Sequence, residues 1–178
     1  MSVIFTPTIH HSGSNFIRHC VGPDYVKWRP NKKVPITRAV DQQITAHFRA
    51  YEDSYMPRYI ALANNPAVKT VIPLRHPALI AVSHKKRHEE SGTGFLYKWF
   101  LMCQIPNAFY FPIETMPFDE LEAFLGKKVS RNRKPMRTLG DYPEKHSLEA
   151  AKTFLKDDWW AVEAALNTDV GRRYYGSG

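Results

Sequence analysis

The sequence has only two cysteines among its 178 residues, Cys20 and Cys103, and no apolar run long enough to cross a bilayer. Two cysteines so far apart indicate no disulfide framework. The pairs His10-His11 and His84/His88 could each ligate a metal, but no cysteine stands at zinc-binding spacing from them, and His84/His88 more simply belong to an exposed basic helix, so no metal site is indicated. The N-terminus lacks the basic and then apolar pattern of a secretory signal. We therefore expect a cytoplasmic protein with free thiols, no bound metal and no membrane anchor.

Internal repeats and low-complexity tracts are also absent, so the chain is not a repeat array or a long linker. A hydrophobic content of 43% suffices for one core. We expect a single domain over 1–178, in which 171–178 form a flexible tail. The formal net charge of +8 favours a partner with several negative charges, such as a phosphorylated nucleotide, a nucleic acid or an anionic polysaccharide.

Apolar runs with strand character alternate with helical patterns along most of the chain. The predicted strands are 2–6, 43–48, 69–74 and 108–113. The predicted helices are 14–21, 54–64, 78–90, 95–103, 117–125, 147–156 and 158–167. A loop rich in proline and lysine is expected at 23–36. This alternation predicts an α/β, three-layer, P-loop-like fold with a central parallel sheet flanked by helices, and ligands at the carboxyl ends of the strands.

The first strand leads into a small polar turn, Ser12-Gly13-Ser14, and then into a helix. Such a junction aims several backbone N–H groups at one point, where the helix dipole also favours negative charge. The sequence therefore predicts a phosphate cradle here. The P-loop signature is incomplete because it needs a lysine where His11 stands. The alternative is a simple capping turn with Ser14 or Asn15 as the N-cap residue.

A second junction of this kind follows the strand that ends at Leu74. Arg75 stands at the carboxyl end of that strand, and Ser83 lies on the helix that follows His76-Pro77. An arginine guanidinium and a serine hydroxyl are suited to hold one phosphate together.

Together the two junctions resemble the cofactor motifs of the sulfotransferases that use 3′-phosphoadenosine 5′-phosphosulfate (PAPS). The resemblance implies that the first loop holds the 5′-phosphosulfate and that the second motif holds the 3′-phosphate. The matching positions are His11, Ser12, Gly13, Ser14 and Asn15 in the loop, and Arg75 and Ser83 in the second motif. Since the family has a lysine where His11 stands, His11, or else His10, would have to stabilise the charge on the bridging oxygen as sulfate leaves.

The resemblance continues towards the C-terminus, where the segment from Phe118 to Gly126 is similar to the family's Phe-Leu-Gly helix. An Arg-Lys-Gly segment that closes over the 3′-phosphate in the family matches Arg133 and Lys134, with Pro135 replacing the glycine. The alternative for this stretch is a basic loop that faces water.

Sulfuryl transfer needs a base that takes the proton of the acceptor, and histidine titrates in the useful range. The family carries a Lys-x-His pattern on the strand before the arginine motif. His47 falls on that histidine and Thr45 on the lysine, so the resemblance implies that His47 is the base. The alternative is a buried histidine that bonds a backbone carbonyl. Glu89 and Glu90 are reserve candidates.

The implied reaction moves a sulfuryl group from PAPS to a hydroxyl or amine of a small-molecule or carbohydrate acceptor and leaves adenosine 3′,5′-bisphosphate (PAP). The chain is short for this family, so we expect an acceptor cleft that is open or completed by a second subunit in a homo-oligomer. Two other classes compete. A P-loop-type nucleotide or small-molecule kinase would need the missing lysine and a magnesium carboxylate. A basic nucleic-acid-binding module would use the clusters 85–87 and 131–137, but no nucleic-acid-binding motif accompanies them.

Overall fold

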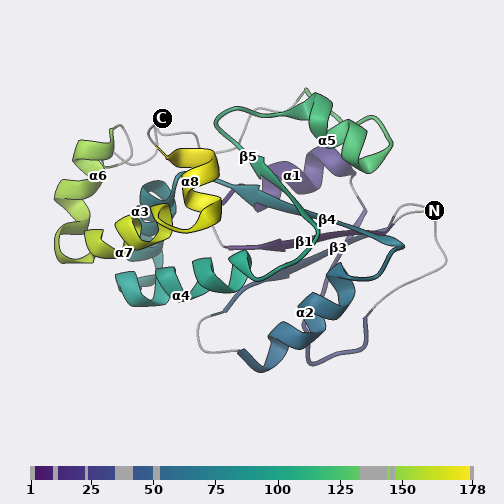
Figure 1. The fold of residues 1–178 in the computed structure, drawn as a ribbon, viewed down its shortest axis with the longest axis horizontal. Coiled ribbons are helices and arrows are strands. Elements are labelled where there is room, and N and C mark those ends of the chain that lie inside the picture. Colours follow the sequence, from purple (N-terminus) through teal and green to yellow (C-terminus); the bar gives the residue numbers. More distant parts are fainter. Residues whose placement is uncertain are drawn as a thin grey trace.

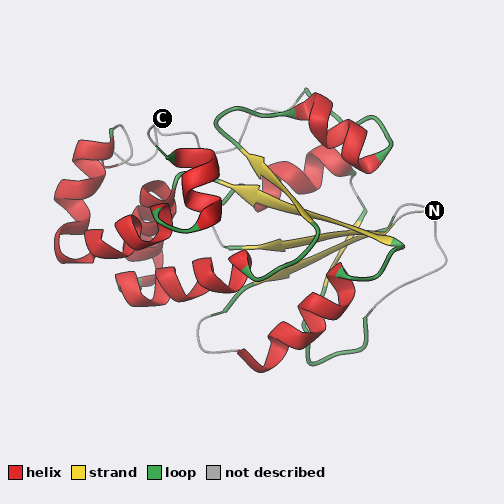
Figure 2. Ribbon diagram, viewed as in Figure 1, coloured by secondary structure: helices red, strands yellow, loops and turns green. Residues whose placement is uncertain are grey.

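The computed structural model describes residues 3–9, 12–22, 24–34, 42–49, 53–132, 144 and 147–176. Within them, five parallel strands form one sheet in the order β2-β3-β1-β4-β5 (Figures 1 and 2). The strands are β1 (Val3–Thr8), β2 (Tyr25–Lys27), β3 (Gln43–His47), β4 (Val68–Leu74) and β5 (Ala108–Pro112). The all-parallel sheet, covered by helices, confirms the predicted fold class.

Helices cover both faces of this sheet (Figure 1). They are α1 (Ser14–Val21), α2 (Met56–Ala63), α3 (Pro77–His88), α4 (Gly92–Cys103), α5 (Phe118–Leu125), α6 (Leu148–Leu155), α7 (Trp159–Leu166) and α8 (Asp169–Tyr175). One apolar core joins α1 and α5 to one face, through residues such as Phe16, Phe111 and Leu121. A larger core joins the opposite face to α2, α3, α4, α6 and α7.

The central strand β1 is buried along its whole length, between β3 and β4. Its last residue, Thr8, lies opposite His47 in the parallel register. Because all the strands run in the same direction, their carboxyl ends meet at one edge of the sheet. The segments that follow β1, β3, β4 and β5 therefore emerge side by side, and the residues predicted to bind a ligand follow these strands.

The predicted strands and helices agree with the structure to within a few residues, with three corrections. The loop expected at 23–36 contains a strand, β2, whose side chains are exposed and whose backbone pairs with β3. Helix α4 begins at Gly92 rather than at 95, because the Gly92 N–H donates a hydrogen bond to the carboxylate of Asp158 at 2.9 Å.

The third correction concerns the predicted tail at 171–178, since residues up to Tyr175 form helix α8. The Thr168 hydroxyl accepts a hydrogen bond from the Gly171 N–H and caps this helix. A side chain at position 171 would place its Cβ 2.1 Å from the carbonyl oxygen of Ala165. The glycine that suggested a loose tail therefore allows α8 to pack closely on the end of α7. In the described part of the chain, no helix has the length and apolar character needed to cross a membrane.

Candidate functional site

The loop after β1 turns into helix α1 through Gly13, which has φ 101° and ψ 21°. This left-handed conformation is unfavourable for residues that carry a Cβ. A Cβ here would lie 2.6 Å from Cδ1 of Ile113, directly after β5, and 3.9 Å from Cβ of Pro73 in β4. The glycine thus brings the start of α1 against the carboxyl ends of β4 and β5.

Gly13 itself is the N-cap residue of α1, and no side chain of the residues that the structure describes caps the helix. The capping alternative with Ser14 or Asn15 is therefore not what the structure has. The first N–H groups of a helix have no acceptor within it, so the N–H groups at the start of α1 are suited to an anion. Ser12 plays a different part, since its hydroxyl and its N–H both donate to the carbonyl of Ile9, at 2.7 and 3.2 Å. His11 lies outside the described residues.

Arg75 follows β4 at the same edge of the sheet and is partly buried. Continuing the alternation of the strand from Pro73, it lies on the face that carries α1. Burial lowers the pKa of Arg75, and the nearby Glu114 and Tyr175 act in the opposite direction. Arg75 makes no ion pair with any other described residue. A partly buried cation without a paired carboxylate is suited to an anionic ligand.

Glu114, after β5, forms hydrogen bonds with two residues that lie beside Arg75. Its carboxylate accepts hydrogen bonds from the His76 N–H at 2.7 Å and from the Tyr175 hydroxyl at 3.0 Å. The ring of His76 also contacts that of Tyr175 edge-on, with the centroids 5.2 Å apart. The end of α8 therefore lies beside Arg75. The sequence reasoning missed Tyr175 because it treated this segment as a tail.

Ser83 lies on α3 with only 1% of its surface exposed. Its Oγ has no hydrogen-bond partner among the described residues. Buried hydroxyls nearly always have a partner, so an unpaired one calls for an explanation, such as a ligand group that the structure does not contain. Arg133 and Lys134, the other residues assigned to the 3′-phosphate by the resemblance, lie outside the described residues.

His47 ends β3 beside the end of β1. Its Nδ1 lies 2.8 Å from the hydroxyl oxygen of Thr8, which is also 3.3 Å from the Ala46 carbonyl oxygen. The hydroxyl has one proton. If that proton goes to the carbonyl, Nδ1–H donates to Thr8 and the lone pair is on Nε2. The hydrogen bond to Thr8 fits a general base, and the side chain of His47 is only partly buried.

The two reserve candidates for the base lie elsewhere. Glu90 follows the far end of α3 and pairs with His84 and Lys98. Burial alone would raise the pKa of Glu90, but hydrogen bonds from His84 and Lys98 outweigh it and lower the pKa to about 2. Glu89 ends the helix with φ 50°. Since α3 starts beside Arg75 and rises about 1.5 Å per residue, these glutamates lie roughly 18 Å away along the helix axis.

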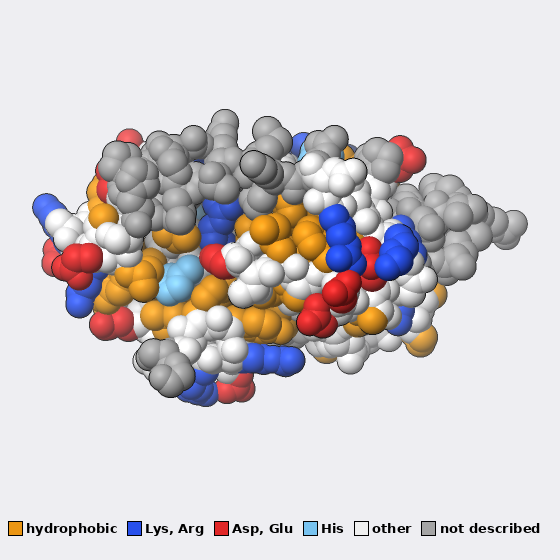
Figure 3. All heavy atoms as spheres, turned by 90° about the horizontal axis from the view of Figure 1, so that it is seen from above, with side chains coloured by type: hydrophobic (Ala, Val, Ile, Leu, Met, Phe, Trp, Pro, Cys, Tyr) orange, Lys and Arg blue, Asp and Glu red, His pale blue; other side chains and the backbone are white. Residues whose placement is uncertain are grey.

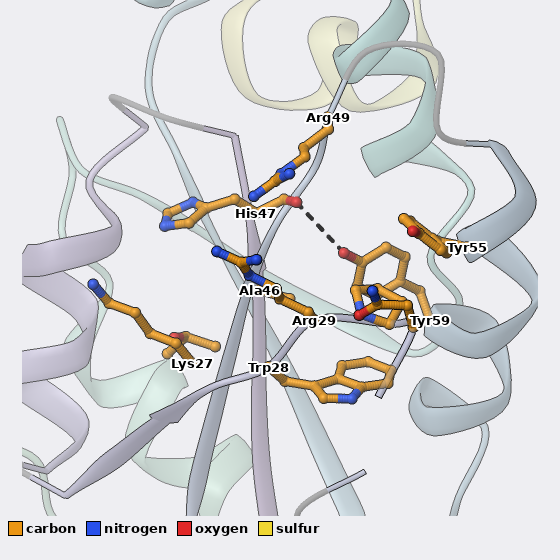
Figure 4. Close-up of a pocket in the computed structure, with 11 residues that line it drawn as sticks. Lys27, Trp28, Arg29, Ala46, His47, Arg49, Tyr55 and Tyr59 are labelled. Carbon is orange, nitrogen blue, oxygen red and sulfur yellow. Dashed lines mark hydrogen bonds between the residues drawn. The ribbon is translucent and has the colours of Figure 1, made fainter. Parts of the chain in front are cut away.

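A pocket of about 180 Å³ opens beside His47. Figure 4 shows the side chains of Arg29 and Arg49 reaching towards the His47 ring, and the aromatic rings of Trp28 and Tyr59 on the other side. The Tyr59 hydroxyl donates to the carbonyl of His47 at 3.4 Å. The sequence reasoning did not identify the cations of this pocket. The available signal in the sequence was the two-residue spacing of Lys27 and Arg29, and of His47 and Arg49.

The basic segment that begins at Arg131 is partly neutralised. Arg131 pairs with Asp119 and Glu122 of α5, at 2.5 and 2.7 Å, and Lys128 pairs with Glu122 at 2.9 Å. Figure 3 shows acidic and basic side chains side by side on the face that it views, rather than a uniformly basic surface. The start of this segment therefore gives little support to a nucleic-acid interface.

Comparisons with known proteins agree with this fold. No family model matches the chain, and no curated protein matches it either. Among solved structures, the mouse sulfotransferase SULT7A1 complexed with PAP is similar, with a TM-score of 0.52 and 14% sequence identity over 97% of this chain and 86% of that chain. At so low an identity the likeness shows a shared fold. The fold implied by the sequence resemblance is thereby confirmed.

Proposed function

We propose that the protein transfers a sulfuryl group from PAPS to a hydroxyl or amine acceptor. The observation that carries this proposal is that one edge of the sheet brings together the uncapped start of α1, Arg75 and His47. The sulfotransferase fold of a PAP-bound neighbour supports it.

The 5′ end of the donor would lie at the start of α1. The N–H groups from Gly13 to Asn15 would bind the phosphosulfate, and the positive end of the helix dipole would favour its charge. Ser12 would act indirectly, because its hydroxyl and N–H hold the turn closed on Ile9. His11 would meet the bridging oxygen, as the sequence resemblance implies.

The 3′-phosphate would be held by Arg75 and Ser83. Arg75 would supply a charge-assisted, two-pronged contact, and the phosphate would give the Ser83 hydroxyl the partner that it lacks. Because Ser83 is 1% exposed, the side chains that cover it would have to move as the phosphate enters. Arg133 and Lys134 would close over the same phosphate.

His47 would take the proton of the acceptor, with Thr8 holding the ring so that Nε2 faces the reacting hydroxyl. PAPS supplies the activated sulfuryl group, and PAP is the leaving group. A positioned base of this kind contributes about 10²–10⁴-fold to a rate. The start of α1 would stabilise the negative charge that develops as the sulfuryl group moves.

The direct test is transfer of radioactive sulfate from labelled PAPS to a panel of phenols, sugars and amines, with the wild type and His47→Ala. We expect transfer by the wild type, a loss of at least 100-fold in His47→Ala, and nearly unchanged affinity for PAP in that variant. His88→Ala, which removes an exposed histidine near the far end of α3, is the matched control and should keep its activity.

Binding of PAP, of ATP with magnesium and of oligonucleotides separates the competing classes. A kinase would bind ATP with magnesium in preference to PAP, and a nucleic-acid-binding module would bind oligonucleotides without saturable affinity for PAP. Either result would overturn the assignment to a sulfotransferase, whereas full activity of His47→Ala would show that His47 is not the base.

A further inference from the structure

We infer that the pocket beside His47 selects an acceptor that carries a negatively charged group, a carboxylate, sulfate or phosphate, on the same small ring unit as the reacting hydroxyl. This inference rests on the proposed function and names the substrate class of the same site.

The register of the sheet puts the relevant side chains on one face. Lys27 of β2 lies opposite Thr45 of β3, and His47 comes two residues further along β3. Because side chains two residues apart in a strand point to the same face, Lys27, Thr45 and His47 share one face. Arg29 and Arg49 follow two residues after Lys27 and His47, so they continue the same two rows.

The described lining of this pocket contains the cations Lys27, Arg29 and Arg49 and no carboxylate. Lys27 and Arg29 are exposed and form no ion pair with a described residue. Like charges gathered in one small pocket repel one another. An anionic ligand would remove that repulsion.

A second observation also points to a ligand. Thr45 lines the pocket, is only 3% exposed, and its hydroxyl has no hydrogen-bond partner in the described part of the chain. An acceptor in the pocket would supply one. Three aromatic residues, Trp28, Tyr55 and Tyr59, also line the pocket; Trp28 and Tyr59 are each 4% exposed and pack on one another, and Tyr55 is partly exposed.

The size of the pocket limits what it can hold. Its volume of about 180 Å³ is below the roughly 300–1,000 Å³ of sites that enclose a drug-sized ligand. One ring, sugar or phenol, therefore fits better than an extended acceptor. With its hydroxyl at His47, such a ring would have its charged group within reach of the flexible Lys27 and Arg29 side chains.

The test uses two matched acceptor pairs that differ in one charged group. Methyl glucuronide is compared with methyl glucoside, and 4-hydroxybenzoate with 4-hydroxybenzyl alcohol. In at least one pair, we expect the acceptor that carries the carboxylate to be sulfated on its hydroxyl with a kcat/KM at least tenfold higher than that of its neutral counterpart. Comparing the two pairs also shows whether the preferred charged acceptor is a sugar or a phenol.

The double variant Lys27→Gln/Arg29→Gln should reduce that preference to about twofold, because each exposed charge contributes up to about fivefold. Its affinity for PAP should stay the same, since neither residue belongs to the donor site. Lys69→Gln is the matched control, because Lys69 lies at the amino end of β4, opposite Ile4. It should leave the preference intact.

Binding supplies a readout that does not need turnover. With PAP present, the amide signals of Thr45 and Ala46 should shift in nuclear magnetic resonance spectra at lower concentrations of the carboxylates than of the neutral probes. Equal binding of both, equal turnover of both, or an unchanged preference in the double variant would overturn the inference. Failure of PAP to bind would instead count against the proposed function, and the probes can then be titrated without it.

Discussion

Arg75→Met should selectively weaken the binding of ligands that carry a 3′-phosphate. Methionine keeps an unbranched apolar stem of similar packing and removes the guanidinium. In the structure Arg75 is partly buried and forms no ion pair with a described residue, so the variant leaves no unpaired carboxylate that was held by it. The free energy of unfolding should therefore change little, and the loss of the guanidinium should appear as weaker binding of the ligand.

The magnitude follows from the surroundings of Arg75. A hydrogen bond to a charged group contributes about 1.5–3 kcal/mol. Glu114 attracts Arg75 in the unliganded protein and would repel the phosphate, so the net loss should lie near the lower half of that range. A loss of about 2 kcal/mol corresponds to roughly 30-fold weaker binding of PAP.

Isothermal titration calorimetry with PAP and with AMP, which lacks the 3′-phosphate, measures this effect. AMP affinity should change by less than about twofold, since no contact to its phosphate is lost. Arg172→Met, on the exposed side of α8, is the matched control and should bind both ligands as the wild type does. If Arg75→Met weakened PAP and AMP equally, or kept the preference for PAP, Arg75 would not be the 3′-phosphate ligand.

Three further predictions concern the loop, the base and the buried ion pairs. Gly13→Ala should lower the free energy of unfolding by about 3 kcal/mol and abolish PAP binding, because φ 101° is strained for alanine and the new methyl group would lie 2.6 Å from the side chain of Ile113. Gly126→Ala, at φ 71° with no atom close to the new methyl group, should lower it by only about 1 kcal/mol, and chemical denaturation measures both. Thr8→Val should lower kcat at least tenfold at unchanged PAP affinity, because the His47 ring loses its hydrogen bond, and steady-state kinetics measure this. Glu90→Gln should lower the free energy of unfolding near neutral pH by about 2–3 kcal/mol. Since the folded-state pKa of Glu90 is lowered from 4.5 to about 2, the wild type should lose this stability as the pH falls from about 4.5 to 2, and the variant should not.

Each of these has a contradicting result. Equal destabilisation by the two glycine substitutions would show that the close contact at position 13 is unimportant. A Thr8→Val enzyme with normal kcat would mean that the hydroxyl does not position the base. Parallel acid denaturation curves for the wild type and Glu90→Gln would mean that the ion pairs around this carboxylate do not stabilise the fold.

The strand-turn-helix units could be predicted because local patterns specify them. The run from Val68 to Leu74 is almost wholly buried, and the Pro77 that follows suits the first turn of a helix. The strand β2 could not be predicted in this way, because all its side chains are exposed and only pairing with β3 holds it. Its formation depends on a distant segment, which periodicity does not show.

The turn at Gly13 and the position of Arg75 after a strand could be predicted from local patterns, and the cations of the pocket beside His47 could not. Gly13 and Arg75 each stand in a short pattern whose geometry is local. Lys27, Thr45 and Arg49 become neighbours only through the parallel register of β2 and β3. A row of polar side chains across a sheet is set by which strand pairs with which, and that choice depends on the whole core.

A crystal structure of the protein grown with PAP would test the proposed donor site. We expect the 5′-phosphate on the N–H groups at the start of α1, and the 3′-phosphate within hydrogen-bond distance of the Arg75 guanidinium and the Ser83 hydroxyl. PAP bound instead in the pocket beside Lys27 and Arg29, or with its 3′-phosphate far from Arg75, would contradict it.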